Sequence, residues 1–270
     1  KIMAYNQSLS IILPVYNERD NLEYLIPQFS NLCTSLLIEY EIIVVDDLSD
    51  DGTSELMKEF RNNNFNSKHI IRKNDRSLPK SIMTGIESSK FESVMWLDAD
   101  GSMDIFSAEV LIKEYLKNPN YYYIGSRFVS GGGYKGQDPN EKNFIKFIKN
   151  IKNSEDSLIA VYLSLLFNKA LKKLINIEIN DLTSGFIIGN RKNIDSSVFL
   201  KSNYGEYFVY LVNDLISKKQ NIVEVGYICK PRKFGNSKTS NNIMTLIRLG
   251  LPYVKAAILC KKNYNKKKKF

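Results

Sequence analysis

Short apolar runs alternate with longer amphipathic stretches along this chain. The runs end in turn residues or carboxylates, as strands of an open α/β sheet do, and the amphipathic stretches have the spacing of covering helices. The predicted strands are 9–15, 41–45, 69–72, 93–97, 121–126, 187–189 and 222–228. The predicted helices are 21–37, a segment beginning at 52–53, 80–89, two segments within 141–175, and 204–218. This order predicts an α/β fold with a mostly parallel central sheet flanked by helices.

Three of the predicted strands lead directly into acidic residues. Glu18 follows the first strand, and Asp46 and Asp47 end the second. Asp98 and Asp100 follow the fourth. Ligands of parallel α/β sheets bind beyond the carboxyl ends of the strands, so these carboxylates are expected to meet in one crevice. Taken singly, each is equally typical of a helix cap or a solvated turn.

The spacing of Asp98 and Asp100 suits a divalent cation. Alternate residues of an extended segment point the same way, so both carboxylates can offer the hard oxygen donors that Mg²⁺ or Mn²⁺ prefers. Such a cation would neutralise a departing diphosphate. Asp-x-Asp also occurs in surface turns, and its place after a buried run is what favours a functional site. One of the aspartates that end the second strand is a candidate to bind a nucleobase or ribose.

Composition bounds the remaining possibilities. With 270 residues, of which 43% are hydrophobic, the chain can bury a large core, and we predict a catalytic domain at 8–240 and an amphipathic basic extension at 241–270. The formal charge of +9 implies an anionic partner. Cys33, Cys229 and Cys260 lack the spacing of metal ligands or a disulfide framework, which fits a reducing cytosol.

Several motifs, taken together and in order, resemble those of inverting family 2 glycosyltransferases. They are the segments 10–18, 43–53, 96–102 and 125–127. Three further segments are similar to the dolichyl-phosphate mannose synthase branch of polyprenyl-phosphate glycosyltransferases, namely 131–133, 181–186 and 231–238. The resemblance implies the GT-A-type fold of nucleotide-diphospho-sugar transferases and a donor such as GDP-mannose.

The resemblance also implies roles for individual residues. Nucleoside contacts are implied for Pro14, Tyr16, Glu18, Val45 and Asp47, and sugar-diphosphate contacts for Asp98, Ala99 and Asp100. Asp100 is the implied metal ligand, with Ser102 as a weaker or water-mediated one. Phosphate binding is implied for Arg127, Arg232 and Lys238, whose charges suit phosphate.

Two positions depart from the branch pattern. Ile187 follows Phe186 where many relatives have an arginine, and the loop 76–79 lacks the glycines common there. The donor and the acceptor therefore stay open at this point.

The implied reaction is a single displacement that inverts the anomeric carbon. A lipid-phosphate acceptor is already anionic and requires no strong base, whereas a hydroxyl acceptor requires a carboxylate to take its proton, and Asp181 is the candidate. We prefer the lipid phosphate. The alternative is a transferase that acts on a polysaccharide or glycolipid hydroxyl, and a non-enzymatic basic binding protein ranks last.

Basic amphipathic segments favour a membrane partner over nucleic acid. The segments 143–151, 158–175 and 243–260 combine apolar positions with basic residues, as interfacial helices do, although a core-facing helix with a solvated basic face has the same pattern. The lysines at 261–262 and 266–269 would attract anionic lipid. Acidic strand ends would repel nucleic-acid phosphates. We therefore predict a cytoplasmic protein, peripheral on the inner face of a membrane, that does not bind nucleic acid.

Overall fold

The computed structural model describes residues 7–73, 75–134, 158–230, 232–234 and 243–267. The strands are β1 (Ser8–Val15), β2 (Glu39–Asp46), β3 (Ser67–Ile71), β4 (Ser93–Trp96), β5 (Tyr122–Ser126), β6 (Gly133–Tyr134), β7 (Ile187–Asn190), β8 (Ile222–Gly226) and β9 (Ile228–Cys229). The α-helices are α1 (Arg19–Ser35), α2 (Thr53–Asn62), α3 (Leu78–Glu87), α4 (Ile105–Lys117), α6 (Leu158–Ile175), α7 (Ser197–Leu200), α8 (Tyr207–Ser217) and α9 (Ile243–Lys267). A short 3-10 helix covers Arg191–Asn193.

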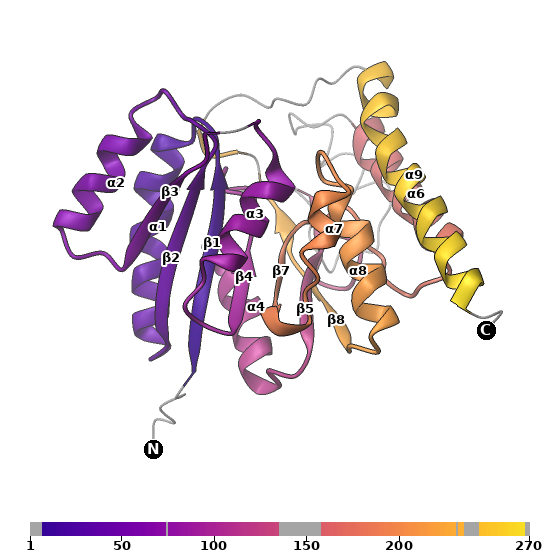
Figure 1. Ribbon diagram of the computed structural model, residues 1–270, viewed down its shortest axis with the longest axis horizontal. Helices are drawn as coiled ribbons and strands as arrows, with labels where there is room; N and C mark the ends of the chain where they lie inside the picture. Colours follow the sequence, from indigo (N-terminus) through magenta and orange to yellow (C-terminus); the bar gives the residue numbers. More distant parts are fainter. Residues whose placement is uncertain (1–6, 74, 135–157, 231, 235–242, 268–270) are drawn as a thin grey trace.

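Seven strands form one central sheet in the order β3-β2-β1-β4-β7-β5-β8. All neighbouring pairs are parallel except those of β7, which runs antiparallel to both β4 and β5. Helices lie on both sides of this sheet (Figure 1). The predicted α/β fold with a mostly parallel sheet is therefore confirmed. The predicted strand 222–228 is in fact divided, because β9 leaves the sheet and pairs with β6.

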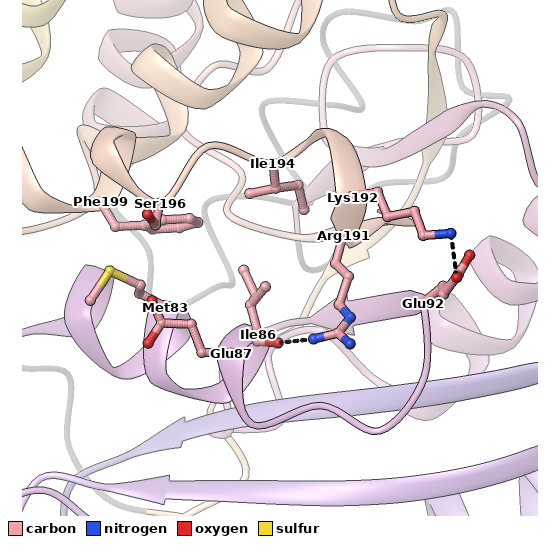
Figure 2. Close-up of a pocket in the computed structure, with 9 residues that line it drawn as sticks. All are labelled: Met83, Ile86, Glu87, Glu92, Arg191, Lys192, Ile194, Ser196 and Phe199. Carbon is pink, nitrogen blue, oxygen red and sulfur yellow. Dashed lines mark hydrogen bonds and ion pairs between the residues drawn. The ribbon is translucent and has the colours of Figure 1, made fainter.

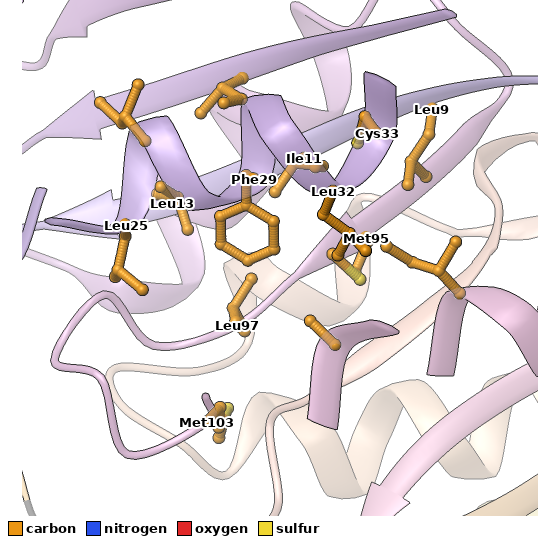
Figure 3. Packing of buried hydrophobic residues seen from close by; sticks show 14 of the residues in the cluster. Leu9, Ile11, Leu13, Leu25, Phe29, Leu32, Cys33, Met95, Leu97 and Met103 are labelled. Atoms are coloured by element: carbon orange, nitrogen blue, oxygen red, sulfur yellow. The ribbon is translucent and has the colours of Figure 1, made fainter. Parts of the chain in front are cut away.

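Alternation along the strands builds two cores. In β1, Ile11 and Leu13 point to one face, where they pack with Phe29 of α1 and with buried residues of α2 and α4 (Figure 3). Ile12 points to the other face, which is covered by buried residues of α3, α6, α7, α8 and α9. The sheet is thus buried on both faces, which explains why its central strands read as continuous apolar runs.

The last described helix belongs to the second core. Ala256, Ala257 and Cys260 of α9 are buried there, and α9 packs beside α6 at one end of the molecule (Figure 1). Because these side chains are small, α9 can approach the rest of the second core closely. The boundary that we predict at residue 240 lies outside the described residues, as does the predicted basic segment 143–151. No helix in the described ranges combines the length and apolar character needed to cross a bilayer.

Candidate functional site

A pocket of about 390 Å³ opens at the carboxyl ends of β1, β2 and β4, where the acidic strand ends were expected to meet. It is lined by Pro14, Val15, Tyr16, Glu18, Asp47, Arg76, Ser77, Leu78, Ser81, Asp98, Ala99, Asp100, Asn203, Tyr204 and Arg232. Most of the residues to which we assign nucleotide or sugar contacts are therefore brought together. Val45 is fully buried in the second core, beside Pro14 in the sheet, and Lys238 lies outside the described residues.

The carboxylates of Glu18, Asp98 and Asp100 and the guanidinium of Arg232 line this pocket together. Arg232 places Nη2 3.2 Å from Asp100 Oδ2 and Nη1 3.8 Å from Glu18 Oε1. Burial and the neighbouring Asp100 carboxylate raise the pKa of half-buried Asp98 to about 7, against the opposing effect of Arg232. Negative charge is therefore crowded here, and a cation in the pocket would relieve it.

The turn after β4 holds Asp100 in a fixed orientation. Its Oδ1 accepts a hydrogen bond from the Ser102 backbone N–H at 2.9 Å, and Gly101 between them has a φ of 78°, which favours glycine. The Lys233 backbone N–H donates to the Asp100 carbonyl oxygen at 3.1 Å. The segment around Arg232 is thereby fastened to the turn that carries the carboxylate.

The donor set fits a divalent cation that is shared with phosphate. Within the described residues there is no group of three or more His, Cys, Asp or Glu side chains able to hold a metal. Mg²⁺, however, is commonly held by one or two carboxylates together with substrate phosphates, and Asp98 and Asp100 can supply these. The crowded negative charge is the feature that such an ion would satisfy.

The Asp47 carboxylate is hydrogen-bonded to residues between β3 and α3. Its Oδ1 accepts a hydrogen bond from Arg72 Nη1, and its Oδ2 accepts one from the Ser77 backbone N–H at 2.8 Å. Arg72 Nη1 also donates to Ser81 Oγ at 2.9 Å. Asp47 thus fixes the loop that borders the pocket, and sequence reasoning missed Arg72, although its place after the predicted strand 69–72 was a usable signal.

Arg76 covers the aromatic ring that we expect to contact the nucleoside. Its Cζ lies 3.5 Å from the centroid of the Tyr16 ring, a close cation–π contact. The guanidinium therefore lies over one face of the ring, at the border of the pocket. Sequence reasoning noted position 76 only as a departure from the glycine-containing loop.

Arg127 and Asp181 form a buried pair near this pocket. Arg127 Nε donates to Asp181 Oδ2 and Nη2 donates to Oδ1, both at 2.8 Å, and Nη2 also donates to Thr183 Oγ1 at 2.7 Å. Asp181 is fully buried, and its charge raises the pKa of Arg127 although burial opposes this. Both oxygens of Asp181 therefore accept hydrogen bonds from Arg127, and the carboxylate orients this guanidinium.

A second pocket, of about 330 Å³, lies where β4 begins and β7 ends, and Figure 2 shows the residues that line it. It lies between α3 and the residues that follow β7, next to Glu92, which precedes β4. Arg191 Nη1 donates to the Ile86 carbonyl oxygen at 3.2 Å, and Lys192 pairs with Glu92. These two cations are engaged within the protein, and the carboxyl ends of the parallel strands lie at the other end of the sheet, so this pocket is not the candidate site.

The mostly parallel seven-stranded sheet with helices on both sides is the GT-A-type fold of glycosyltransferases. A crystal structure of glucosyl-3-phosphoglycerate synthase from Mycobacterium tuberculosis, in complex with Mn²⁺, UDP-glucose and phosphoglyceric acid, is similar in fold, with a TM-score of 0.64 and 13% sequence identity. The match covers 97% of this chain and 83% of that chain. Residues 10–197 match the sequence model of glycosyl transferase family 2, and the chain belongs to this family.

The names of two curated relatives each include a polyprenyl phosphate. A dolichol-phosphate mannosyltransferase of Pyrococcus furiosus is 36% identical over 126 residues, which cover 46% of this chain and 34% of the relative. An undecaprenyl-phosphate 4-deoxy-4-formamido-L-arabinose transferase of Pseudomonas fluorescens is 28% identical over 244 residues, which cover 89% of this chain and 62% of the relative. The chain thus spans less than two thirds of the length of either relative.

Proposed function

We propose that this chain transfers a sugar from a nucleoside diphosphate to a polyprenyl phosphate, with inversion at the anomeric carbon. The observation that carries the choice of acceptor is the pairing of Asp181 with Arg127. Asp181 is our candidate base for a hydroxyl acceptor, yet both of its oxygens accept hydrogen bonds from a charged guanidinium. A phosphate acceptor is already anionic and needs no base, so this pairing favours it.

The donor would lie along the strand ends. The base and ribose would occupy the end of the pocket formed by Pro14, Tyr16 and Arg76, and the diphosphate would reach Asp100 and Arg232. Mg²⁺ or Mn²⁺, held by Asp100 with help from Ser102, would supply the charge neutralisation that a leaving diphosphate needs. GDP-mannose is the first donor to test, since the branch that the motifs resemble suggests it.

The acceptor phosphate would be held by basic residues. Arg127 is oriented by Asp181 and stays charged, so it can grip a phosphate or the departing diphosphate through its remaining donors. Arg232 is our second candidate, and Lys238 is the third from the sequence alone. An anionic oxygen held in this way would attack the anomeric carbon in line.

A lipid acceptor also requires contact with a membrane, and α6 and α9 present a surface suited to it. Large apolar side chains of both helices are exposed, namely Tyr162, Leu163 and Leu166 of α6 and Leu251, Ile258 and Leu259 of α9. Exposed basic residues accompany them, namely Lys169, Lys173, Arg248, Lys255, Lys261 and Lys262. This mixture is typical of helices that lie in the interface of an anionic bilayer. We call it the α6–α9 surface and propose that it binds the inner face of a membrane.

The acceptor class can be tested with labelled donors. The protein is incubated with Mn²⁺ or Mg²⁺, polyprenyl phosphate and, in turn, radiolabelled GDP-mannose and UDP-sugars, and the label is followed into the lipid phase. A parallel reaction offers a polysaccharide or glycolipid hydroxyl instead. Label in the lipid phase only with polyprenyl phosphate supports the proposal, and label transferred only to the hydroxyl acceptor contradicts it.

A further inference from the structure

A tyrosine of the last helix reaches the wall of the catalytic pocket. Tyr253 of α9 lies against Gly205, in the loop between α7 and α8. A Cβ built on Gly205 would lie 2.0 Å from the Tyr253 hydroxyl oxygen, so the hydroxyl fills the space that any other side chain at position 205 would need. Glycine is therefore required by the close approach of α9.

The loop that Tyr253 touches forms part of the pocket. Asn203, Tyr204 and Asp98 all line this pocket. The buried Glu206 carboxylate accepts hydrogen bonds from the backbone N–H groups of Asn203, at 2.9 Å, and Tyr204, at 3.1 Å. Glu206 thus holds this wall from within the loop, and the Tyr253 hydroxyl lies against the same loop at Gly205.

Tyr253 is itself firmly placed. Its ring packs edge-on against Phe167 of α6, with 6.0 Å between ring centroids. Burial, and then the neighbouring Tyr204 and Glu206, raise the pKa of Tyr253, while Arg127 opposes the shift. The hydroxyl therefore stays protonated, and it lies within the electrostatic reach of the pocket and of the Arg127–Asp181 pair.

We propose that Tyr253 is a positioning residue of the catalytic pocket, which fixes the Asn203–Tyr204 wall by packing its hydroxyl against Gly205. The assignment deepens the proposed function, since it presumes that a nucleotide sugar binds in this pocket. It also makes α9, which lies beyond the residues that match the family, part of the catalytic apparatus. The same helix then carries the α6–α9 surface on one face and a support of the pocket on another.

The contact can be tested by a reciprocal pair of substitutions. Gly205→Ala places a methyl group on the Tyr253 hydroxyl, and Tyr253→Phe removes that oxygen while keeping the ring on Phe167. The next ring atom, Cζ, would be 3.1 Å from the new methyl group, which a small shift relieves. Tyr253→Phe alone should loosen the wall, because nothing then fills the space against Gly205. The double variant should regain what each single variant loses, because the new methyl group takes the place of the hydroxyl.

Two measurements report directly on the Asn203–Tyr204 wall. Both are made at a temperature at which circular dichroism shows that every variant is folded. Hydrogen exchange of the amides of residues 203 and 204 should quicken at least about tenfold in Gly205→Ala and return towards the unaltered rate in the double variant. The dissociation constant of GDP-mannose or UDP-glucose with Mn²⁺, measured by calorimetry, should rise by about tenfold and recover in parallel.

Gly189→Ala is the matched control. A Cβ at Gly189 would lie 2.1 Å from the ring of Tyr122, at the end of the sheet away from the pocket, so this change should lower the melting temperature but leave the dissociation constant unaltered. Three results would overturn the role of Tyr253. The first is unchanged hydrogen exchange at residues 203 and 204 in Gly205→Ala, and the second is a dissociation constant that does not change together with exchange. The third is a double variant in which neither quantity recovers. If no sugar reaches polyprenyl phosphate, the proposed acceptor fails, while the exchange measurement still decides the role of Tyr253.

Discussion

Opposite charges meet at the acidic end of the sheet, where one arginine contacts two carboxylates. Arg232 bridges Glu18 and Asp100, and Asp98 beside them has a pKa raised to about 7 by burial and by Asp100. The single positive charge of Arg232 offsets at most one of the three carboxylate charges. Asp100 is the carboxylate whose orientation is fixed by the backbone, so we assign the cation chiefly to it.

Asp100→Asn should therefore weaken metal binding while preserving the local turn. The amide oxygen can still accept the hydrogen bond from Ser102, but the charge that attracts the cation is lost. We expect the affinity for Mn²⁺ in the presence of GDP or UDP to fall at least about tenfold, as measured by electron paramagnetic resonance of free Mn²⁺. Asp20→Asn, which removes an exposed carboxylate from α1, should leave this affinity unchanged, and an equal loss in both variants would argue against Asp100 as ligand.

Asp181 and Arg127 should behave as one unit in catalysis. If Asp181 acts only by orienting Arg127, the Arg127→Ala variant and the Arg127→Ala, Asp181→Asn double variant should transfer sugar to polyprenyl phosphate at similarly reduced rates, because the second change has nothing left to orient. A further drop of about a hundredfold in the double variant would indicate that Asp181 takes a proton itself.

At the scale of elements, strands and helix ends position the site. Asp104 caps the N-terminus of α4. Its carboxylate accepts a hydrogen bond from the Ser107 backbone N–H at 3.0 Å and pairs with Lys230 at 2.5 Å. This cap fixes the segment between Asp100 and α4, and the ion pair ties it to the chain that carries Arg232. Although burial opposes it, Lys230 and Ser107 lower the pKa of Asp104.

Asp104→Ala should destabilise the protein by about 1 kcal/mol near neutral pH, because the cap is lost. Asp104→Asn should cost less, since asparagine caps helices well. The folded-state pKa is lowered, so the carboxylate stabilises the protein above its ordinary pKa of about 3.9, and this contribution disappears as pH falls through the lower folded value. Urea unfolding at pH 7 and in the acid range should show the difference from Asp104→Ala shrinking with acidity, and a constant difference would contradict this.

The elements that could be predicted from sequence are those with strong local patterns. The runs that became β1, β2 and β4 are apolar and lead into acidic residues, so both the strands and the acidic edge could be predicted from the sequence pattern. The antiparallel direction of β7 could not be predicted, since four residues look the same in either direction. The contact of Asp47 with Arg72 was equally hidden, because it depends on β2 and β3 being neighbours in the sheet.

At the scale of the whole molecule, α9 joins the second core to the outer surface. The sequence reveals its amphipathic character, but which core its small residues Ala256 and Ala257 enter depends on where α6 and α8 lie. The contact of Tyr253 with Gly205 was unpredictable for the same reason, since the two residues lie far apart in the sequence. Exposed apolar residues on the rest of α9, such as Leu251 and Ile258, belong to the α6–α9 surface, for which we propose membrane binding.

Replacing apolar residues of the α6–α9 surface with acidic ones should weaken membrane binding. We expect Leu251→Glu and Ile258→Glu to reduce sedimentation with phosphatidylglycerol vesicles several-fold, because each change removes buried apolar area and adds repulsion from the anionic surface. Leu200→Glu is the control, since Leu200 of α7 is 61% exposed, as Leu251 is 60% exposed, but lies outside the α6–α9 surface. Equal loss in all three variants would show that charge alone, and not this surface, governs binding.

Diffraction from crystals soaked with Mn²⁺ and either GDP or UDP tests the catalytic pocket most directly. The anomalous signal of Mn²⁺ locates the ion independently of any assumption about the reaction. We expect a peak beside the Asp100 carboxylate, with the diphosphate between it and Arg232 and the base near Tyr16. Nucleotide bound in the pocket beside Arg191, or a Mn²⁺ peak remote from Asp100, would contradict the site assignment.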